Sequence, residues 1–209
     1  MIPFGEKVAG YDIPVLNERE IRAAAGILFL ATYTSLMFIL FDGNFIPVKF
    51  VLTFFLLDLL IRVLISPRYA PMLIAGRLIV RKQHPEYVGA PQKRFAWSIG
   101  IVLSSVMFYL FIVVNVYGPV TGVICLVCLL FLFFEAAFGI CLGCVFYPWF
   151  FKKKIQYCPG EVCEKQHYQH VSGRQVLVLA LFVAAILPAV YILKQHYSKP
   201  PHAMFRHAQ

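Results

Sequence analysis

The chain has 209 residues, of which 60% are hydrophobic and only 14% are charged, and its mean hydropathy is +0.75. Soluble domains are about half apolar and about a quarter charged, so this composition argues against a soluble protein and indicates an integral membrane protein. The formal net charge is +9, but the basic residues cluster in the gaps between apolar runs. This pattern indicates membrane topology and contact with lipid headgroups rather than binding of nucleic acid.

Five apolar runs each approach the roughly 20 residues that a helix needs to cross the hydrocarbon core of a bilayer. The predicted spans cover, in chain order, about residues 21–41, 47–65, 95–117, 120–147 and 175–193. At this length they form one domain, so the predicted fold class is all-α, a single polytopic membrane domain over residues 1–209.

A shorter apolar segment, residues 70–82, separates the second and third runs and cannot cross a bilayer. A helix would sort its residues onto an apolar face, with Met72, Leu73, Gly76 and Ile79, and a basic face, with Arg77 and Arg81. This segregation predicts an interfacial helix in the headgroup layer, with an ordinary connecting helix as the alternative.

The lysine and arginine residues divide unevenly between the two sides of the five-span topology. Fourteen precede the first span or lie in the connections after the second and fourth spans. The other side receives four, namely Lys49, Lys194, Lys199 and Arg206. Because basic residues favour the cytoplasmic side, the N-terminus is predicted to be cytoplasmic and the C-terminus to lie on the opposite side.

The six cysteines form three close pairs, all after residue 124: Cys125 and Cys128, Cys141 and Cys144, Cys158 and Cys163. In the predicted topology the first pair lies near the outer surface and the second at the cytoplasmic end of the same fourth span. The third pair lies in the cytoplasmic loop that follows, residues 148–174.

Three interpretations of these thiols are open. In a Cys-x-x-Cys pair, one thiol attacks an external disulfide and the other resolves the mixed disulfide, and the nearby lysines 152–154 would favour the thiolate. Alternatively, Cys141, Cys144, Cys158 and Cys163 have a spacing that suits a four-thiolate zinc site, to which His167 and His170 add further potential ligands. Thirdly, cysteine packs in membrane helices as a small apolar residue, which is the preferred interpretation for Cys125 and Cys128.

Glu135 is the only carboxylate of the fourth predicted span and falls near mid-membrane. A buried acid there is costly and is usually functional or paired, so we expect it to handle protons, to orient a substrate or to hydrogen-bond a neighbouring helix. Its helical position is roughly 120° from that of Cys141, which predicts different faces. Asp58 and Arg62 are one turn apart and are predicted to pair locally.

The sequences GAPQKRFAWSIG, FEAAFGICLGC and YCPGEVC resemble, in this order, a bacterial family of integral membrane proteins known only as a domain of unknown function. The resemblance spans about residues 5–165 and includes a Gly-x-Cys-x-Gly-Cys element at 139–144 and a Cys-Pro-Gly-x-x-Cys element at 158–163. It implies a bacterial inner-membrane location. It also implies thioredoxin-like or rhodanese-like neighbours, and hence thiol or sulfur metabolism.

The leading hypothesis is a membrane thiol-redox or sulfur-handling protein that needs no cofactor, with Cys141 and Cys144 as the primary pair and Cys158 and Cys163 as their partners. Glu135 would handle protons or orient the substrate, and a thioredoxin-like or rhodanese-like protein would be the soluble partner. One alternative is a non-enzymatic scaffold or accessory subunit with a four-cysteine zinc site. Another is a transporter of small solutes or sulfur anions that uses Glu135, Asp58 and Arg62. The sequence does not decide whether the protein is an enzyme.

Overall fold

The structure is a computed structural model that describes residues 4–8, 13–151, 172–197 and 202–203. Its main elements are, in order, β1 (Val15–Asn17), α1 (Glu18–Asp42), α2 (Ile46–Leu60), α3 (Pro71–Val80), β2 (Tyr87–Gly89), α4 (Ala90–Phe108), β3 (Val116–Tyr117), α5 (Pro119–Phe133), α6 (Leu142–Phe151), α7 (Gly173–Tyr197) and β4 (His202–Ala203). Three of the helices continue directly into a π-helical turn: Ile61–Ile65 after α2, Tyr109–Val113 after α4 and Phe134–Phe138 after α5. A short 3-10 turn, Pro67–Tyr69, precedes α3. The chain is mostly helical, as predicted.

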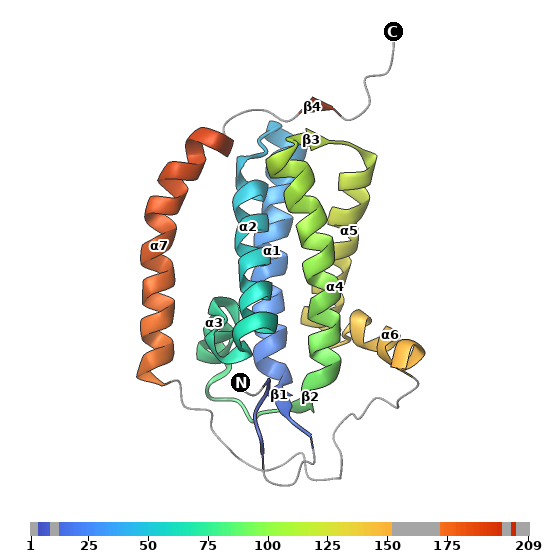
Figure 1. Cartoon of the computed structure of the whole chain (residues 1–209), viewed down its shortest axis with the longest axis vertical. Helices are drawn as coiled ribbons and strands as arrows, with labels where there is room; N and C mark the ends of the chain where they lie inside the picture. The colour runs from blue at the N-terminus through green and yellow to red at the C-terminus, as the bar shows by residue number, and fades with distance from the viewer. Residues whose placement is uncertain (1–3, 9–12, 152–171, 198–201, 204–209) are drawn as a thin grey trace.

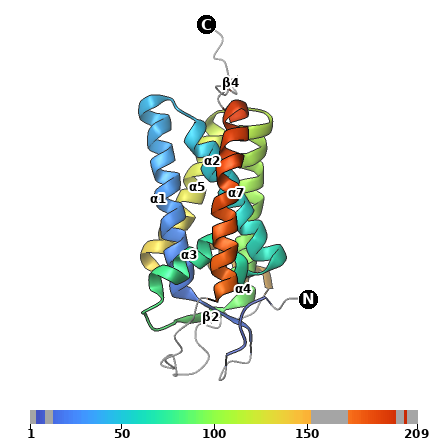
Figure 2. The ribbon, with the colours of Figure 1, turned by 90° about the vertical axis from the view of Figure 1, so that its left-hand side faces the viewer.

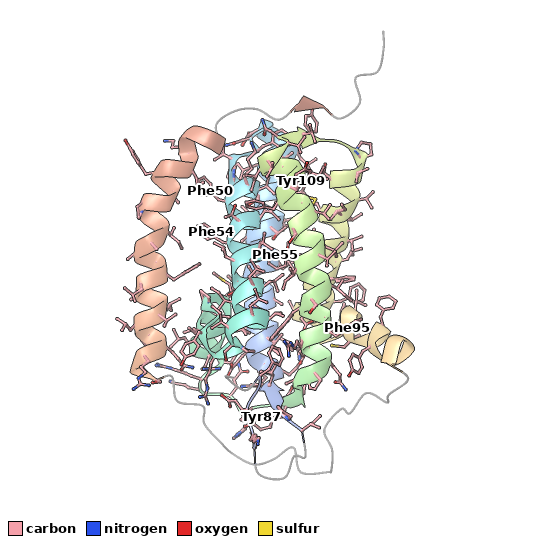
Figure 3. All side chains as sticks on the ribbon, viewed as in Figure 1. Phe50, Phe54, Phe55, Tyr87, Phe95 and Tyr109 are labelled. Carbon is pink, nitrogen blue, oxygen red and sulfur yellow. The ribbon has the colours of Figure 1, made fainter. Side chains whose placement is uncertain are left out.

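Helices α1, α2, α4 and α5 lie side by side along one axis, and successive members run in opposite directions (Figures 1 and 2). Helix α7 runs along the α2 side of this bundle, where the rings of Phe54 and Phe182 meet at 5.9 Å in an edge-on contact. Figure 3 shows Phe54 on the side of α2 that faces α7. Strands β1 and β2, helices α3 and α6, and the start of α7 all gather at one end, which we call the β1–β2 end (Figure 1).

Three helical stretches are long and apolar enough to cross a membrane, namely Glu18–Asp42, Ala90–Val113 and Pro119–Phe138. The other two predicted spans differ from these in composition. The continuous helix Ile46–Ile65 carries Lys49, Asp58 and Arg62, whereas α7 has a shorter apolar stretch, Gly173–Ile186, and an internal proline at position 188. Three spans are therefore supported, and the prediction of five is not confirmed.

The predicted fourth span, residues 120–147, is not one helix. The helix that begins at Pro119 ends at Phe138, and Gly139 caps it in the left-handed conformation at φ +67°. The guanidinium of Arg22 donates a hydrogen bond to the carbonyl of Ala137 at 3.3 Å, which satisfies one of the carbonyls freed at this end. A separate helix, α6, then begins at Leu142 and runs sideways from the bundle (Figure 1).

The short antiparallel pair β1–β2 determines how α1 and α4 begin. Its register pairs Val15 with Gly89 and Asn17 with Tyr87, and each strand passes into its helix without an intervening loop. The first turns of α1 and α4 are therefore neighbours. Helix α4 begins at Ala90 rather than near residue 95, so it includes Lys93, which precedes the predicted third span.

The segment predicted as an interfacial helix over residues 70–82 forms helix α3, but its buried face differs from the predicted one. Arg77, assigned to the basic face, is buried and pairs with Glu20 of α1 at 2.9 Å. Ile79, assigned to the apolar face, is 63% exposed. Because α3 packs closely on α1, its orientation follows from the contact with protein as well as from amphipathicity.

Gly76 permits this close packing. A Cβ atom added there would lie 2.5 Å from the backbone oxygen of Glu20. We expect Gly76→Ala to lower the free energy of unfolding by about 1–3 kcal/mol, because α3 must move away from α1. The control is Gly122→Ala in α5, where an added Cβ meets nothing within 4 Å. Thermal unfolding of both variants in detergent tests this, and equal midpoints would contradict it.

Candidate functional site

A cluster of one buried cation and two partly buried carboxylates lies where α1, α4 and α5 meet at the β1–β2 end. The ammonium of Lys93 is only 1% exposed and lies 2.9 Å from a carboxylate oxygen of Glu18. It also forms an ion pair with Glu135, in the π-helical turn that follows α5. We call Glu18, Lys93 and Glu135 the Lys93 cluster. One buried cation thus links the carboxylates of two other helices, which gives each of these charges a partner.

The structure places Glu135 near the end of the bundle, not at mid-membrane as predicted. Its ion-pair partner, Lys93, lies in the first turn of α4, and its own helix ends three residues later. The other carboxylate on Lys93, Glu18, is the first residue of α1. The prediction was wrong because it assumed an uninterrupted helix to residue 147, which would have moved the helix centre toward Glu135.

Cys141 and Cys144 lie at the start of α6, beyond the end of the spanning helix. Cys141 occupies the N-cap position, and its carbonyl accepts hydrogen bonds from the N–H groups of Cys144 and Val145. The N–H of Cys144 also lies 3.3 Å from the sulfur of Cys141 and donates to it. Cys141 is half-buried, whereas Cys144 is only 4% exposed and carries a free thiol, as Cys141 does. A cysteine at a helix N-terminus is a common setting for a reactive thiol.

A cavity of about 80 Å³ is bordered both by Glu135 of the Lys93 cluster and by Cys141 at the start of α6. Side chains of Arg62, Trp97, Cys128, Glu135 and Cys141 line it, and the rest of its wall is largely apolar. The sequence predicted that Glu135 and Cys141 would point to different faces. The break at Gly139 changes the direction of the chain between them, and both residues now border the same space.

Opposing effects act on the thiol of Cys141. Interaction with the Cys144 side chain and burial raise its pKa, while the nearby ammonium of Lys93 lowers it. The raising effects are larger, so the thiol of Cys141 is protonated at neutral pH. A reaction at Cys141 therefore requires that its proton be removed as the substrate binds, and Glu135 is a carboxylate on the same cavity wall.

The structure also describes the predicted pair of Asp58 and Arg62 and the cysteines at positions 125 and 128. Asp58 and Arg62 pair at 2.5 Å, as predicted, and both are buried. The guanidinium of Arg62 also lies 5.2 Å from the centre of the Trp97 ring, in a cation–π contact. Cys125 and Cys128 carry free thiols on a separate helix from Cys141 and Cys144, not on one shared helix.

The predicted loop pair, Cys158 and Cys163, lies outside the residues that the structure describes, as do His167 and His170. Within the described ranges, no group of three or more histidine, cysteine, aspartate or glutamate side chains is arranged to hold a metal ion. Cys141 and Cys144 supply two thiols, and the four-thiolate zinc site stays a prediction.

Sequence reasoning did not predict that Lys93 links Glu135 to Glu18. One weak signal was present: Glu18 directly follows residues 15–17, and Lys93 lies four residues after residues 87–89, and these two short segments include Val15, Tyr87 and Val88, residue types typical of strands. Pairing of those segments would have predicted that Glu18 and Lys93 are close.

These features define the chain as a helical membrane protein with a buried charge cluster and a Cys-x-x-Cys pair at one end of its bundle. The family described as "Domain of unknown function (DUF4395)" matches residues 16–152, which are 137 of the 209 residues. The chain belongs to this family. The matched range includes residues 139–144 and ends before Cys158.

Neither a curated protein nor a solved structure matches the chain significantly.

Proposed function

We propose that this protein is a membrane thiol-redox or sulfur-handling protein whose primary pair is Cys141 and Cys144. The observation that carries the proposal is the position of Cys141, at the N-cap of α6 and on the wall of a cavity that it shares with Glu135. Cys158 and Cys163 would be the partner pair. The distribution of basic residues supports a cytoplasmic position for the β1–β2 end, where a thioredoxin-like or rhodanese-like protein would reach the thiols.

The unequal exposure of the two thiols suggests the order of the reaction. Cys141, the more accessible, would lose its proton to Glu135 and attack one sulfur of a substrate disulfide. This forms a mixed disulfide and releases the other substrate sulfur as a thiolate, which takes a proton. The buried Cys144 would then attack the sulfur of Cys141, releasing the second substrate thiol with the proton of Cys144. The substrate gains two electrons and two protons, and Cys141 and Cys144 become a disulfide that a thioredoxin-like protein would reduce.

Alkylation followed by mass mapping tests this proposal. In reduced membranes, a small maleimide is expected to modify Cys141 faster than Cys144, and mild disulfide oxidants should protect both together. Cys141→Ser should leave Cys144 unprotected after oxidation, because no partner remains, whereas Cys125→Ser should leave the protection intact. If both thiols react equally before and after oxidation, the proposal is wrong.

A scaffold with a structural zinc site remains the alternative, and metal analysis of the purified full chain separates the two. The zinc proposal predicts about one zinc per chain, lost when Cys158 is replaced by serine. The thiol-redox proposal predicts no stoichiometric metal and a disulfide that forms reversibly. The two outcomes differ in metal content as well as in thiol reactivity.

A further inference from the structure

A second group of charges lies at the β1–β2 end and belongs to neither the Lys93 cluster nor the thiol cavity. Three arginines converge there from separate elements: Arg68 in the turn before α3, Arg77 in α3 and Arg174 in the first turn of α7. They border a cavity of about 390 Å³, together with Glu6, Tyr69, Ser172 and Gln175. An adjoining cavity of about 330 Å³ shares Glu6, Arg68 and Arg77. We call Arg68, Arg77 and Arg174, together with these two cavities, the arginine site.

The charges of this site are unbalanced in favour of the cations. Three arginines and one carboxylate, Glu6, border the larger cavity. Glu6 lies 3.4 Å from Arg68, a long and mostly exposed contact that compensates little charge. Arg174 is exposed, and among the described residues it forms no ion pair. Glu20 balances the charge of Arg77, so the excess of positive charge at the site comes from Arg68 and Arg174, and an anion would neutralise it.

Arg77 provides an independent indication of a ligand. Its side chain is only 9% exposed, and one of its terminal nitrogens lies 2.9 Å from a carboxylate oxygen of Glu20. Its Nε–H group is buried without a hydrogen-bond partner in the described part of the chain. A buried donor without an acceptor is costly, and arginine donates to oxyanions through adjacent N–H groups. Arg77 thus lines both cavities and has one hydrogen-bond donor that no group of the described chain accepts.

Hydrogen bonds of the Gln175 side chain connect the backbone near Arg68 with the backbone near Arg174. The side chain of Gln175 donates to the carbonyl of Arg68 at 3.3 Å and accepts from the N–H of Ser172 at 3.0 Å. These bonds tie the start of α7 to the turn before α3, so Arg68 and Arg174 face one space. The start of the 25-residue helix α7 adds the positive end of its dipole.

From these observations we infer that the arginine site binds a phosphate-like oxyanion. The ligand is either a free anion or the phosphate of an anionic lipid headgroup, since the site lies at the end of a membrane bundle. The two sources share the same recognition chemistry, in which guanidinium groups donate to several oxygens of one tetrahedral anion. The inference does not depend on the proposed thiol function.

Thermal unfolding of the purified full-length protein in a neutral detergent tests the inference in two arms. One arm compares inorganic phosphate with chloride at equal ionic strength, and the other compares added phosphatidylglycerol with phosphatidylcholine. Arg174→Gln is the first variant, because it removes a site charge without breaking an ion pair of the described chain. Arg68→Gln is the second, and Arg81→Gln, an exposed arginine that lines neither cavity, is the matched control.

We expect saturable stabilisation of the wild-type protein, with an apparent Kd that rises about tenfold in Arg174→Gln and in Arg68→Gln. Arg81→Gln should bind as the wild type does. Stabilisation by inorganic phosphate would identify a free anion as the ligand, and stabilisation by phosphatidylglycerol alone would identify a lipid headgroup. If neither anion stabilises the wild type, or if all three variants respond as it does, the inference is overturned.

Discussion

Replacing Lys93 with methionine is expected to lower the free energy of unfolding by about 3–5 kcal/mol, because two partly buried carboxylates then lose the cation between them. Glu18 and Glu135 both lose the ion pair that they form in the wild type, and their negative charges repel each other. Methionine has a similar length and apolar stem, so the packing volume changes little. Thermal or denaturant unfolding in detergent measures the effect.

The origin of this loss can be separated from a simple packing defect. Adding Glu18→Gln and Glu135→Gln to Lys93→Met removes the unpaired charges and should recover much of the lost stability. Arg94→Met is the matched control: Arg94 is the next residue, is exposed, and lies over the ring of Phe4 in a single cation–π contact. It is expected to cost about 0.5–1 kcal/mol. A triple variant no more stable than Lys93→Met alone would show that charge pairing is not the cause.

Replacing Gly143 with leucine is expected to displace α6 from α4 and to cost about 2–3 kcal/mol, the upper part of the range for overpacking. A Cβ atom at position 143 would lie 2.7 Å from the Cβ of Ala96 and 2.9 Å from its Cα. Because the Cα of Ala96 belongs to the backbone of α4, it cannot move aside as the end of a flexible side chain could. The contact between Phe95 and Tyr147, whose ring centres are 5.7 Å apart, should be lost as well. Figure 3 shows Phe95 on the part of α4 next to α6.

This substitution also has a chemical readout. Cys144 is buried at the start of α6, so displacement of the helix should raise its rate of alkylation at least tenfold, a factor that corresponds to about 1.4 kcal/mol of easier opening. Gly122→Leu is the control, because no atom lies within 4 Å of a Cβ at that position. It should alter neither the stability nor the reactivity of Cys144. An unchanged alkylation rate in Gly143→Leu would contradict this packing of α6 on α4.

The sequence predicted the helical membrane fold because long apolar runs have few alternatives in a bilayer, where backbone polar groups must be satisfied within the segment. It also predicted the Asp58–Arg62 pair, which depends only on helical spacing. It missed the break at Gly139, since an apolar run continues on both sides of that residue and hides the change of direction. Glycine is the usual residue at the left-handed C-terminal cap, so this position held a local signal.

The composition of the candidate site was harder to predict for a different reason. Lys93 looks like an interfacial anchor when only its own segment is considered, because its burial depends on carboxylates that are 75 and 42 residues away in the chain. The placement of Cys141 beside Glu135 depends likewise on the turn between two helices. Such contacts come from tertiary packing, which periodicity and spacing along one segment do not contain.

The Lys93 cluster also has a consequence for how the protein enters the membrane during synthesis. Helices α1 and α4 precede α5 in the chain, so Glu18 and Lys93 are synthesised before Glu135. Insertion of a carboxylate such as Glu135 is costly for an isolated helix. The cation that pairs with it, Lys93, belongs to a helix that is synthesised earlier. We therefore expect α5 to insert more readily once α1 and α4, which carry Glu18 and Lys93, have packed together. The Lys93 cluster would in this way make membrane insertion of the segment with Glu135 depend on Lys93.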